Sequence, residues 1–272
     1  MKTFIIAEIG WNHMGNMTLA KEMISAAKES GADYAKFQTW SVKNLVAGPW
    51  DNDGRKEIYV KAELSKEMHE ELYDYCNSIN INFLTSIFNF DDYFKIKNLK
   101  LKTMKIPSHE IHNLDLIKKV SEVCDELLVS AGAAKWDEIL NITKLNEFQK
   151  ITLMHCVSSY PCHFNDLNFN KYNELQLLSE KKIGYSGHYQ GTMDAEIAIT
   201  LRSSYIEKHF TIDNKLPGRD NKFALNFNDF SELNTYRNLF NKFNISKGLD
   251  LQKCEKDIFK NYRGRWSKNQ KN

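Results

Sequence analysis

The chain alternates short apolar segments typical of buried β-strands with longer amphipathic segments typical of α-helices. The predicted strands are Phe4–Gly10, Tyr34–Trp40, Asn82–Phe88, Thr103–Ser108, Leu127–Gly132, Ile151–Val157, Lys182–His188 and Tyr205–Thr211. The predicted helices are Thr18–Ser30, Ser65–Asn77, Asp91–Asn98, Asn113–Cys124, Trp136–Asn146, Asn168–Ser179, Thr192–Leu201 and Phe227–Phe243. Strands that alternate with helices form a parallel sheet, and eight such units in a chain of this length predict a closed (β/α)8 TIM barrel.

One connection in this pattern is much longer than the others. The polar stretch Ser41–Lys61 separates the second strand from its helix and is predicted to be a loop. A long connection in a compact domain is typical of a lid or a substrate loop, although a loosely ordered insertion has the same pattern. Its aromatic part, Trp40–Tyr59, could instead be buried against a second copy in a homodimer. No linker or composition break precedes residue 245, so we expect one barrel domain over residues 1–245 and a solvated basic tail over 246–272.

The charge and the cysteine content exclude several classes of protein. A net charge of +2 is too small to indicate a nucleic-acid partner. The five cysteines are odd in number and include no CxxC pair, which argues against a disulfide framework and a structural zinc site and favours a reducing compartment. The N-terminal apolar run is interrupted at Glu8, too early for a signal peptide, and no membrane-spanning apolar run follows. We therefore expect a cytoplasmic protein with no membrane partner.

Polar side chains recur at the carboxyl ends of the predicted strands. Catalytic groups of TIM barrels lie at these ends, whereas residues at the strand starts mostly serve stability. The residues that this rule gathers at one mouth are Glu8, Lys36, Gln38, Ser86, Phe88, Lys105, Ser108, Ser130, His155, Ser158, Ser186, His188, Glu207 and His209.

These residue types indicate three kinds of chemistry. Lys36 and Lys105 lie within strands that are covered on both faces, so each charge needs a partner, and with the serine hydroxyls they favour a phosphate-bearing anion as substrate. His188 and His209 end neighbouring strands and could share one divalent cation, or they could be ordinary hydrogen-bonded loop residues. The carboxylates of Glu8 and Asp220 could hold a polyol or move protons.

Seven motifs carry a family resemblance: AEIGWNHMG, GADYAKFQT, FLTSIF, KIPS, HCVSSYP, GYSGH and YIEKHFT…LPGRD. In this order they resemble the motifs of the sialic acid synthase (NeuB) family over about residues 4–225. The resemblance implies a transferase that condenses phosphoenolpyruvate with the open-chain aldehyde of an N-acylated hexosamine, such as N-acetylmannosamine. The implied products are phosphate and a nine-carbon 2-keto acid, and the implied cofactor is a divalent metal, Mn²⁺ or Mg²⁺.

The resemblance also assigns roles by position. His188 and His209 match the metal ligands of the family, and Glu8 and Asp220 match positions that meet the sugar and the attacking water. We make no choice between these two carboxylates as the proton-transfer group. The positions that match phosphoenolpyruvate-binding residues are Lys36, Ser86, Lys105, Ser108, Ser130, Tyr160 and Ser186, and those that match sugar-binding residues are Glu8, Gln38, Phe88 and Asp220.

The sequence departs from the family at three places. Ser186-Gly187-His188 stands where Ser-Asp-His is common, and Arg219-Asp220-Asn221 stands where Pro-Asp-His is common. One acid and one imidazole are thus missing beside the expected metal ligands, which predicts altered surroundings for the metal. Typical members also continue into a C-terminal antifreeze-like (SAF) domain that contacts the N-acyl group of the sugar, and this sequence ends near where the linker to that domain would begin. We therefore expect a modified acceptor sugar, or a partner chain that supplies the missing contacts.

Two other functions are compatible with the same residues. A metal-dependent aldolase acting on pyruvate could use the histidine pair and the lysines, and would release no phosphate. A barrel that binds phosphoenolpyruvate or a sugar without turnover would account for the altered motifs.

Overall fold

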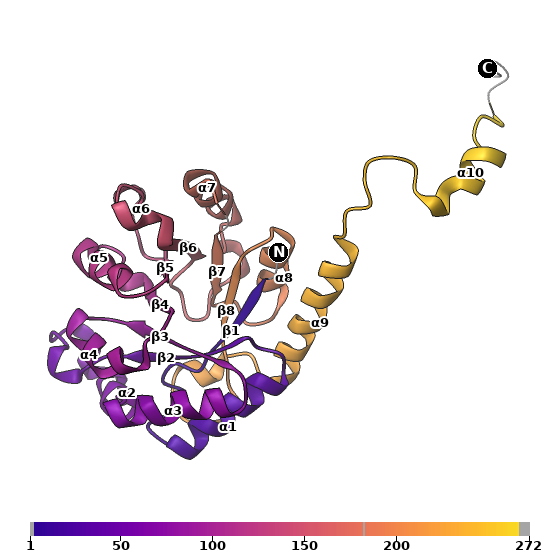
Figure 1. The fold of residues 1–272 in the computed structure, drawn as a ribbon. Helices are drawn as coiled ribbons and strands as arrows, with labels where there is room; N and C mark the ends of the chain where they lie inside the picture. The colour runs from indigo at the N-terminus through magenta and orange to yellow at the C-terminus, as the bar shows by residue number, and fades with distance from the viewer. Residues whose placement is uncertain (1–2, 182, 267–272) are drawn as a thin grey trace.

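The eight predicted strands form a closed, fully parallel barrel in the order β1 to β8 (Figure 1). The computed structural model describes residues 3–181 and 183–266. The strands are β1 (Phe4–Glu8), β2 (Tyr34–Thr39), β3 (Asn82–Ile87), β4 (Thr103–Ile106), β5 (Glu126–Ser130), β6 (Ile151–Cys156), β7 (Gly184–Gly187) and β8 (Tyr205–His209). The prediction of a (β/α)8 barrel is confirmed, with strands slightly shorter than the apolar runs. The predicted start of the seventh strand, Lys182, lies outside the described residues.

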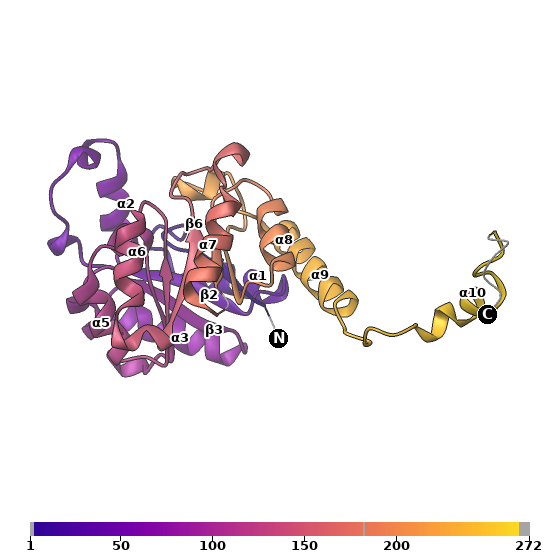
Figure 2. The same cartoon turned by 90° about the horizontal axis from the view of Figure 1, so that it is seen from above.

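Helices surround the barrel on all sides (Figure 2). They are α1 (Met17–Glu29), α2 (Arg55–Ala62), α3 (Lys66–Ser78), α4 (Tyr93–Ile96), α5 (Leu114–Glu122), α6 (Trp136–Thr143), α7 (Phe169–Ser179), α8 (Met193–Thr200), α9 (Phe227–Phe243) and α10 (Lys256–Asn261). The predicted helix over Asp91–Asn98 is only partly formed, because α4 is a single turn between the 3₁₀ segments Phe90–Asp92 and Lys97–Leu99. Lys100 then adopts a left-handed conformation, which ends the turn.

The long connection after β2 contains a helix, so the prediction of a loop over Ser41–Lys61 was wrong for its second half. Helix α2 buries only two of its side chains, Ile58 and Ala62, and this narrow contact explains why its sequence lacks a clear helical period. Tyr59 packs edge-on against Trp11 and Trp40, with ring centroids 5.1 and 5.3 Å away. The connection is therefore folded back onto the strand ends of β1 and β2.

Two separate apolar clusters support the strands. The larger cluster fills the layer between the barrel and its helices and includes residues from every strand. The smaller cluster lies inside the barrel and consists of Ile6, Leu84, Leu128, Met154 and Tyr205. These residues occupy the lower part of the barrel interior, so the upper part is left for polar groups.

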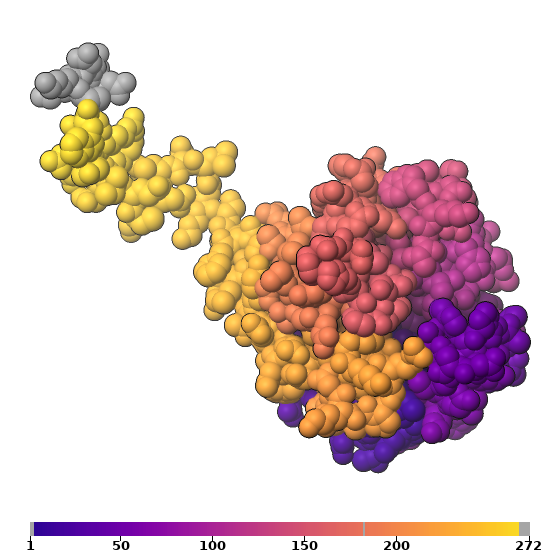
Figure 3. Space-filling model, turned by 180° about the vertical axis from the view of Figure 1, so that it is seen from behind, coloured from indigo at the N-terminus to yellow at the C-terminus, as the bar shows by residue number. Residues whose placement is uncertain are grey.

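Helix α9 closes the ring of helices by packing against α8 and α1. Arg237 on α9 pairs with Asp33 and donates to the carbonyl oxygen of Thr3, which ties this helix to the amino ends of β1 and β2. Beyond α9, residues 245–266 extend away from the barrel in all three views and end in α10 (Figures 1 to 3). The side chains of Leu249, Ile258 and Trp266 are exposed there. The division into a domain over 1–245 and a tail over 246–272 stays a prediction.

Gly31, which follows α1, allows a direct test of this packing. Its φ of +94° is left-handed, and a Cβ added there would lie 2.1 Å from Asn234 Nδ2 on α9. We expect Gly31→Ala to lower the free energy of unfolding by about 2–3 kcal/mol, from left-handed strain of roughly 1–2 kcal/mol plus the displaced Asn234. Urea denaturation measures this loss. Gly54→Ala is the matched control, because Gly54 has a φ of +89° but no atom within 4 Å of the added Cβ. Equal losses in the two variants would contradict the proposed contact with Asn234.

Candidate active site

The two-residue repeat of the strands places a polar layer above the small interior cluster. Each inward-facing apolar residue is followed two positions later by a polar one, because alternate side chains of a strand face the same side. Ile6 is thus followed by Glu8, Leu84 by Ser86, Leu128 by Ser130, Met154 by Cys156 and Tyr205 by Glu207. All five of these following side chains are buried. The sequence pattern therefore concentrates polar groups at one depth of the barrel.

The centre of this layer is a cluster of two lysines and two glutamates. Lys36 Nζ donates to Glu8 Oε2 at 2.6 Å and lies 3.6 Å from Glu207 Oε1. Lys105 Nζ donates to Glu207 Oε1 at 2.6 Å, and Ser186 Oγ lies 3.2 Å from the same oxygen. Because β4 is not a neighbour of β8 in the barrel, the Lys105–Glu207 contact crosses the interior. The two lysines therefore have the charge partners that their burial requires.

Burial and pairing change the proton affinities of this cluster in different directions. Burial raises the pKa of Glu8, although Lys36 opposes this effect. Burial also acts to raise the pKa of Glu207, but the ammonium groups of Lys105 and Lys36 hold it down at about 2. Burial lowers the pKa of Lys105. Glu207 is thus the fixed negative charge of the cluster, whereas Glu8 is the carboxylate that protonates more easily.

Hydroxyl groups converge beside this cluster, above Gly132 at the end of β5. A Cβ at Gly132 would lie 2.4 Å from Ser158 Oγ and 2.8 Å from Ser108 Oγ, so only glycine leaves room for them. Within the described chain, Ser158 Oγ and the buried Ser130 Oγ have no hydrogen-bond partner. Ser108 Oγ lies 3.4 Å from Cys156 Sγ and accepts from Gly132 N at 3.3 Å. Unpaired buried hydroxyls beside two ammonium groups form a site suited to an oxyanion.

His188 and His209 lie side by side at the rim, with ring centroids 5.4 Å apart. His188 Nδ1 donates to Val157 O at 2.8 Å, which leaves Nε2 free. His209 Nδ1 lies 3.3 Å from Asp220 Oδ2. The Tyr160 ring packs on His188 at 4.0 Å between centroids and is itself half exposed. The structure thus brings the predicted metal ligands together and sets Asp220 behind one of them.

The two imidazoles fit a divalent cation as part of its ligand set. A backbone carbonyl orients His188 and a carboxylate lies behind His209, and both are the usual outer contacts of metal-bound histidines. Among residues 3–181 and 183–266, no group of three or more His, Cys, Asp or Glu side chains could hold a metal ion. The remaining ligands would therefore have to be water or substrate atoms.

The rim residues predicted to meet the sugar lie beside these groups. Gln38 Nε2 donates to Glu8 Oε1. Phe88 is partly buried and packs against His109, with ring centroids 4.8 Å apart, and against Trp40 at 5.6 Å. Gln38 and Phe88 thus line the side of the mouth formed by β2 and β3.

Asn221 takes a structural position where the family pattern has an imidazole. It is fully buried, and its Oδ1 accepts from Thr211 Oγ1 at 2.6 Å. Its Nδ2 donates to Pro217 O at 2.8 Å and to Asn12 O at 3.2 Å. Asn221 therefore holds the segment that carries Asp220 against the loop after β1.

The structure corrects the predicted position of His155 and gives Glu207 a central position that the sequence did not assign. The expectation that His155 points into the mouth is wrong, because its ring packs against Phe169 and Tyr185 and its Nε2 lies 2.8 Å from Leu167 O, outside the barrel. The strand period explains this error, since Met154 and Cys156 face inward. Glu207 was recognised as a strand-end residue but received no role, although its alternation with the inward-facing Tyr205 could have predicted its central position.

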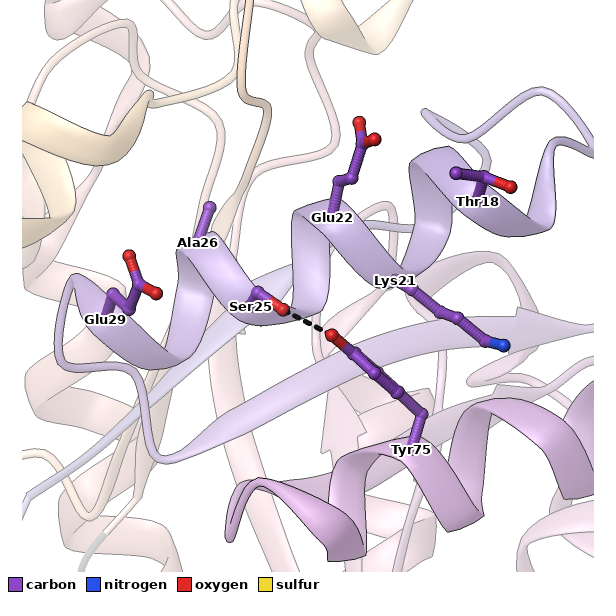
Figure 4. Close-up of a pocket in the computed structure, with 7 residues that line it drawn as sticks. All are labelled: Thr18, Lys21, Glu22, Ser25, Ala26, Glu29 and Tyr75. Carbon is purple, nitrogen blue, oxygen red and sulfur yellow. Dashed lines mark hydrogen bonds between the residues drawn. The ribbon is translucent and has the colours of Figure 1, made fainter.

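A second hollow lies on the outer surface, between α1 and α3 (Figure 4). It is lined by Thr18, Lys21, Glu22, Ser25, Ala26, Glu29 and Tyr75, and Ser25 Oγ lies 2.7 Å from Tyr75 OH. Lys21 Nζ pairs with Glu71, beside the hollow, at 2.7 Å. This groove shares no residue with the mouth of the barrel and has no feature that indicates a ligand.

The fold and the mouth together define a TIM-barrel enzyme with a buried lysine–glutamate cluster beside a histidine pair. The sequence of residues 23–244 matches the NeuB family. The chain is 34% identical to the N,N'-diacetyllegionaminic acid synthase of Campylobacter jejuni, over 96% of this chain and 82% of that protein. It is 33% identical to the pseudaminic acid synthase of Helicobacter pylori, over 84% of this chain and 72% of that protein.

A solved structure agrees with these sequence relatives. The sialic acid synthetase of Leptospira borgpetersenii, in complex with citrate, superimposes with a TM-score of 0.86 at 28% identity and covers 98% of this chain and 93% of that one. The chain belongs to the NeuB family of sialic acid synthase-like enzymes. The resemblance stated from the motifs is confirmed, and the residue roles carried over with it stay predictions. No helix in the described part of the chain is long and apolar enough to cross a membrane.

The buried Asp220 allows a test of the rim electrostatics in metal-free protein. Burial raises the pKa of Asp220 from 3.8 to about 7. Between these pH values the unfolded chain ionises this group before the folded chain does, so folding loses stability as pH rises. We expect the stability of Asp220→Asn relative to the wild type to increase with pH over this window, by up to about 1.4 kcal/mol per pH unit. Urea denaturation with a chelator at pH 5, 6, 7 and 8 measures this slope, and parallel curves for the two proteins would contradict it.

Proposed function

We propose that the chain condenses phosphoenolpyruvate with the open-chain aldehyde of an N-acetylmannosamine-like or related modified sugar. The products are a sialic-acid-like 2-keto acid and phosphate. The observation that carries this proposal is the buried lysine–glutamate cluster, which lies beside hydroxyls that have no partner within the described residues. The relatives in Campylobacter jejuni and Helicobacter pylori are synthases of legionaminic and pseudaminic acids, which supports the same class of product.

The anionic substrate would be bound by the cluster and the hydroxyls. Lys36 and Lys105 provide the positive charge, and Ser86, Ser108, Ser130, Ser186 and Tyr160 provide hydrogen-bonding groups. An anion at Lys36 competes with the carboxylate of Glu8.

The second substrate would be held at the rim. His188 and His209 are the residues that would hold Mn²⁺ or Mg²⁺, and such a cation supplies Lewis-acid polarisation of an aldehyde oxygen. Gln38 and Phe88 would orient the sugar beside Glu8 and Asp220. The identity of the acceptor depends on these rim residues and on the folded connection that carries Tyr59.

Three proton movements accompany the proposed reaction. A carbon–carbon bond forms between C3 of phosphoenolpyruvate and the aldehyde carbon, water adds at C2, and the bond from C2 to the phosphate oxygen breaks. The former aldehyde oxygen gains a proton and the attacking water loses one. When the bond from C2 to the phosphate oxygen breaks, the new C2 hydroxyl becomes the ketone and its proton leaves with the phosphate. We assign the first transfer to Asp220, whose pKa of about 7 leaves it partly protonated at neutral pH, and the second to Glu8.

A pyruvate aldolase is the second candidate. Burial lowers the pKa of Lys105, and this supports the aldolase because a lowered pKa favours the neutral, nucleophilic amine. The contact between Lys105 and Glu207 opposes this role because it stabilises the charged form. Trapping with borohydride in the presence of pyruvate distinguishes the two: a covalent adduct at Lys105 would favour the aldolase.

Phosphate release tests the proposed reaction. With phosphoenolpyruvate, Mn²⁺ and a panel of aldoses that includes N-acetylmannosamine and 2,4-diacetamido-trideoxy sugars, we expect release with one acceptor only. His209→Ala should reduce the rate by at least about 100-fold, since loss of a metal ligand typically costs more than the 10- to 100-fold of an outer contact. His112→Ala is the matched control, because His112 is exposed and lies outside the barrel strands.

The outcomes separate the three functions. Metal-dependent release that His209→Ala abolishes and His112→Ala preserves would support the synthase and identify its acceptor. Binding of phosphoenolpyruvate by calorimetry without release on any sugar would favour a binding barrel or an acceptor outside the panel. Absence of both binding and release would contradict the proposal.

A further inference from the structure

Another buried ion pair, Lys208–Asp194, lies outside the barrel, behind the histidine pair. Lys208 follows Glu207 on β8 and faces the helices, with 2% of its surface exposed. Its Nζ donates to both carboxylate oxygens of Asp194, at 2.9 and 2.8 Å, and to the carbonyl oxygen of Tyr189 at 2.6 Å. Asp194 comes from the first turn of α8 and is fully buried. The ammonium group thus has three oxygen acceptors, one of which belongs to the main chain.

Gly187 leaves the space that this carboxylate fills. A Cβ at Gly187 would lie 2.4 Å from Asp194 Oδ2 and 2.4 Å from Cε1 of Tyr185. Tyr185 OH also donates to Asp194 Oδ2, at 2.8 Å. Glycine is therefore required at this position by space rather than by backbone conformation, and the carboxylate of Asp194 lies against the main chain of β7 one residue before His188.

The same ion pair restrains the main chain on both sides of His188 and immediately before His209. His188 lies between Gly187, which Asp194 covers, and Tyr189, whose carbonyl oxygen Lys208 holds. His209 immediately follows Lys208 on β8. The register of the strands pairs Gly187 with Lys208, so the two histidines extend from adjacent points of the β7–β8 ladder. A single interaction between α8 and β8 therefore restrains the backbone that carries both imidazoles.

We propose that the Lys208–Asp194 pair is a positioning element that holds His188 and His209 in the relative geometry needed to share one cation. This inference rests on the proposed function, because it takes these two histidines as the metal ligands. A buried ion pair is a poor source of stability compared with apolar side chains of similar volume. Lys208 also uses a hydrogen bond on Tyr189 O, and a methionine in its place could not restrain that carbonyl.

The double variant Asp194→Asn with Lys208→Met tests the proposal. Each single variant leaves a buried charge unpaired and should lower the melting temperature, whereas the double variant removes both charges and should recover much of it. We expect the folded double variant to bind Mn²⁺ roughly 10- to 100-fold more weakly than the wild type, as found when outer contacts of metal ligands are lost. Titration with Mn²⁺ alone, followed by electron paramagnetic resonance of the unbound ion, measures this affinity.

A matched control uses the buried pair at the other end of the barrel. Asp33→Asn with Arg237→Met removes an ion pair that ties α9 to the strand starts. This variant should lose stability without any change in Mn²⁺ affinity. Tyr185→Phe is a milder probe, since it keeps both charges and removes only the hydroxyl that donates to Asp194. Tyr185→Phe should weaken Mn²⁺ binding slightly and leave the melting temperature unchanged. This variant replaces the double variant in the test if the double variant does not fold.

The result that would overturn the proposal is distinct from failure of the proposed function. Wild-type Mn²⁺ affinity in the folded double variant, or in Tyr185→Phe if that is the variant measured, would overturn the positioning role and leave the metal site intact. Absence of Mn²⁺ binding by the wild type, with phosphate release that needs no metal, would overturn both. A loss of affinity equal to that of the Asp33–Arg237 control would show a general effect of stability and would also reject the proposal.

Discussion

The compensation of charge inside the barrel is the constraint on which the rest of the structure depends. Two ammonium groups and two carboxylates are removed from water in the same layer, and none of them would be tolerated there alone. Lys36 connects the two carboxylates, since it contacts Glu8 and lies close to Glu207. The strands that carry these groups must therefore keep one register, because a shift of a single residue would turn each charge toward the apolar layer outside.

The carboxylates at the mouth differ in proton affinity. Glu207 remains ionised because two lysines surround it, whereas the pKa values of Glu8 and Asp220 are both raised by burial. Two carboxylates with raised pKa values thus lie near the two lysines. The arrangement suits a reaction in which an anion is bound and protons are transferred nearby without a net change in the buried charge.

The strand period explains which parts of the site could be predicted from the sequence. Short apolar runs between amphipathic segments identified the eight strands, and the rule that catalytic groups lie at the carboxyl ends of barrel strands identified nearly all of the groups there. His155 was misplaced because the rule of strand ends ignores which face a side chain occupies. Helix α2 was missed because it buries only Ile58 and Ala62. The pairing of Lys105 with Glu207 across the interior depends on barrel closure, which no local pattern contains.

Gly187 shows most clearly what a motif comparison cannot resolve. Read from the sequence, the Ser186-Gly187-His188 motif lacks an acid beside a metal ligand. In the structure a carboxylate is nevertheless present at this point, supplied by Asp194 from the next helix and placed against the Gly187 main chain. Asn221 is a parallel case, since it fixes the segment of Asp220 through its hydrogen bonds rather than through an imidazole. One departure is thus matched by a side chain from another element, and the other by a side chain at the same position that makes different hydrogen bonds. The surroundings of the histidine pair must therefore be judged from the assembled barrel.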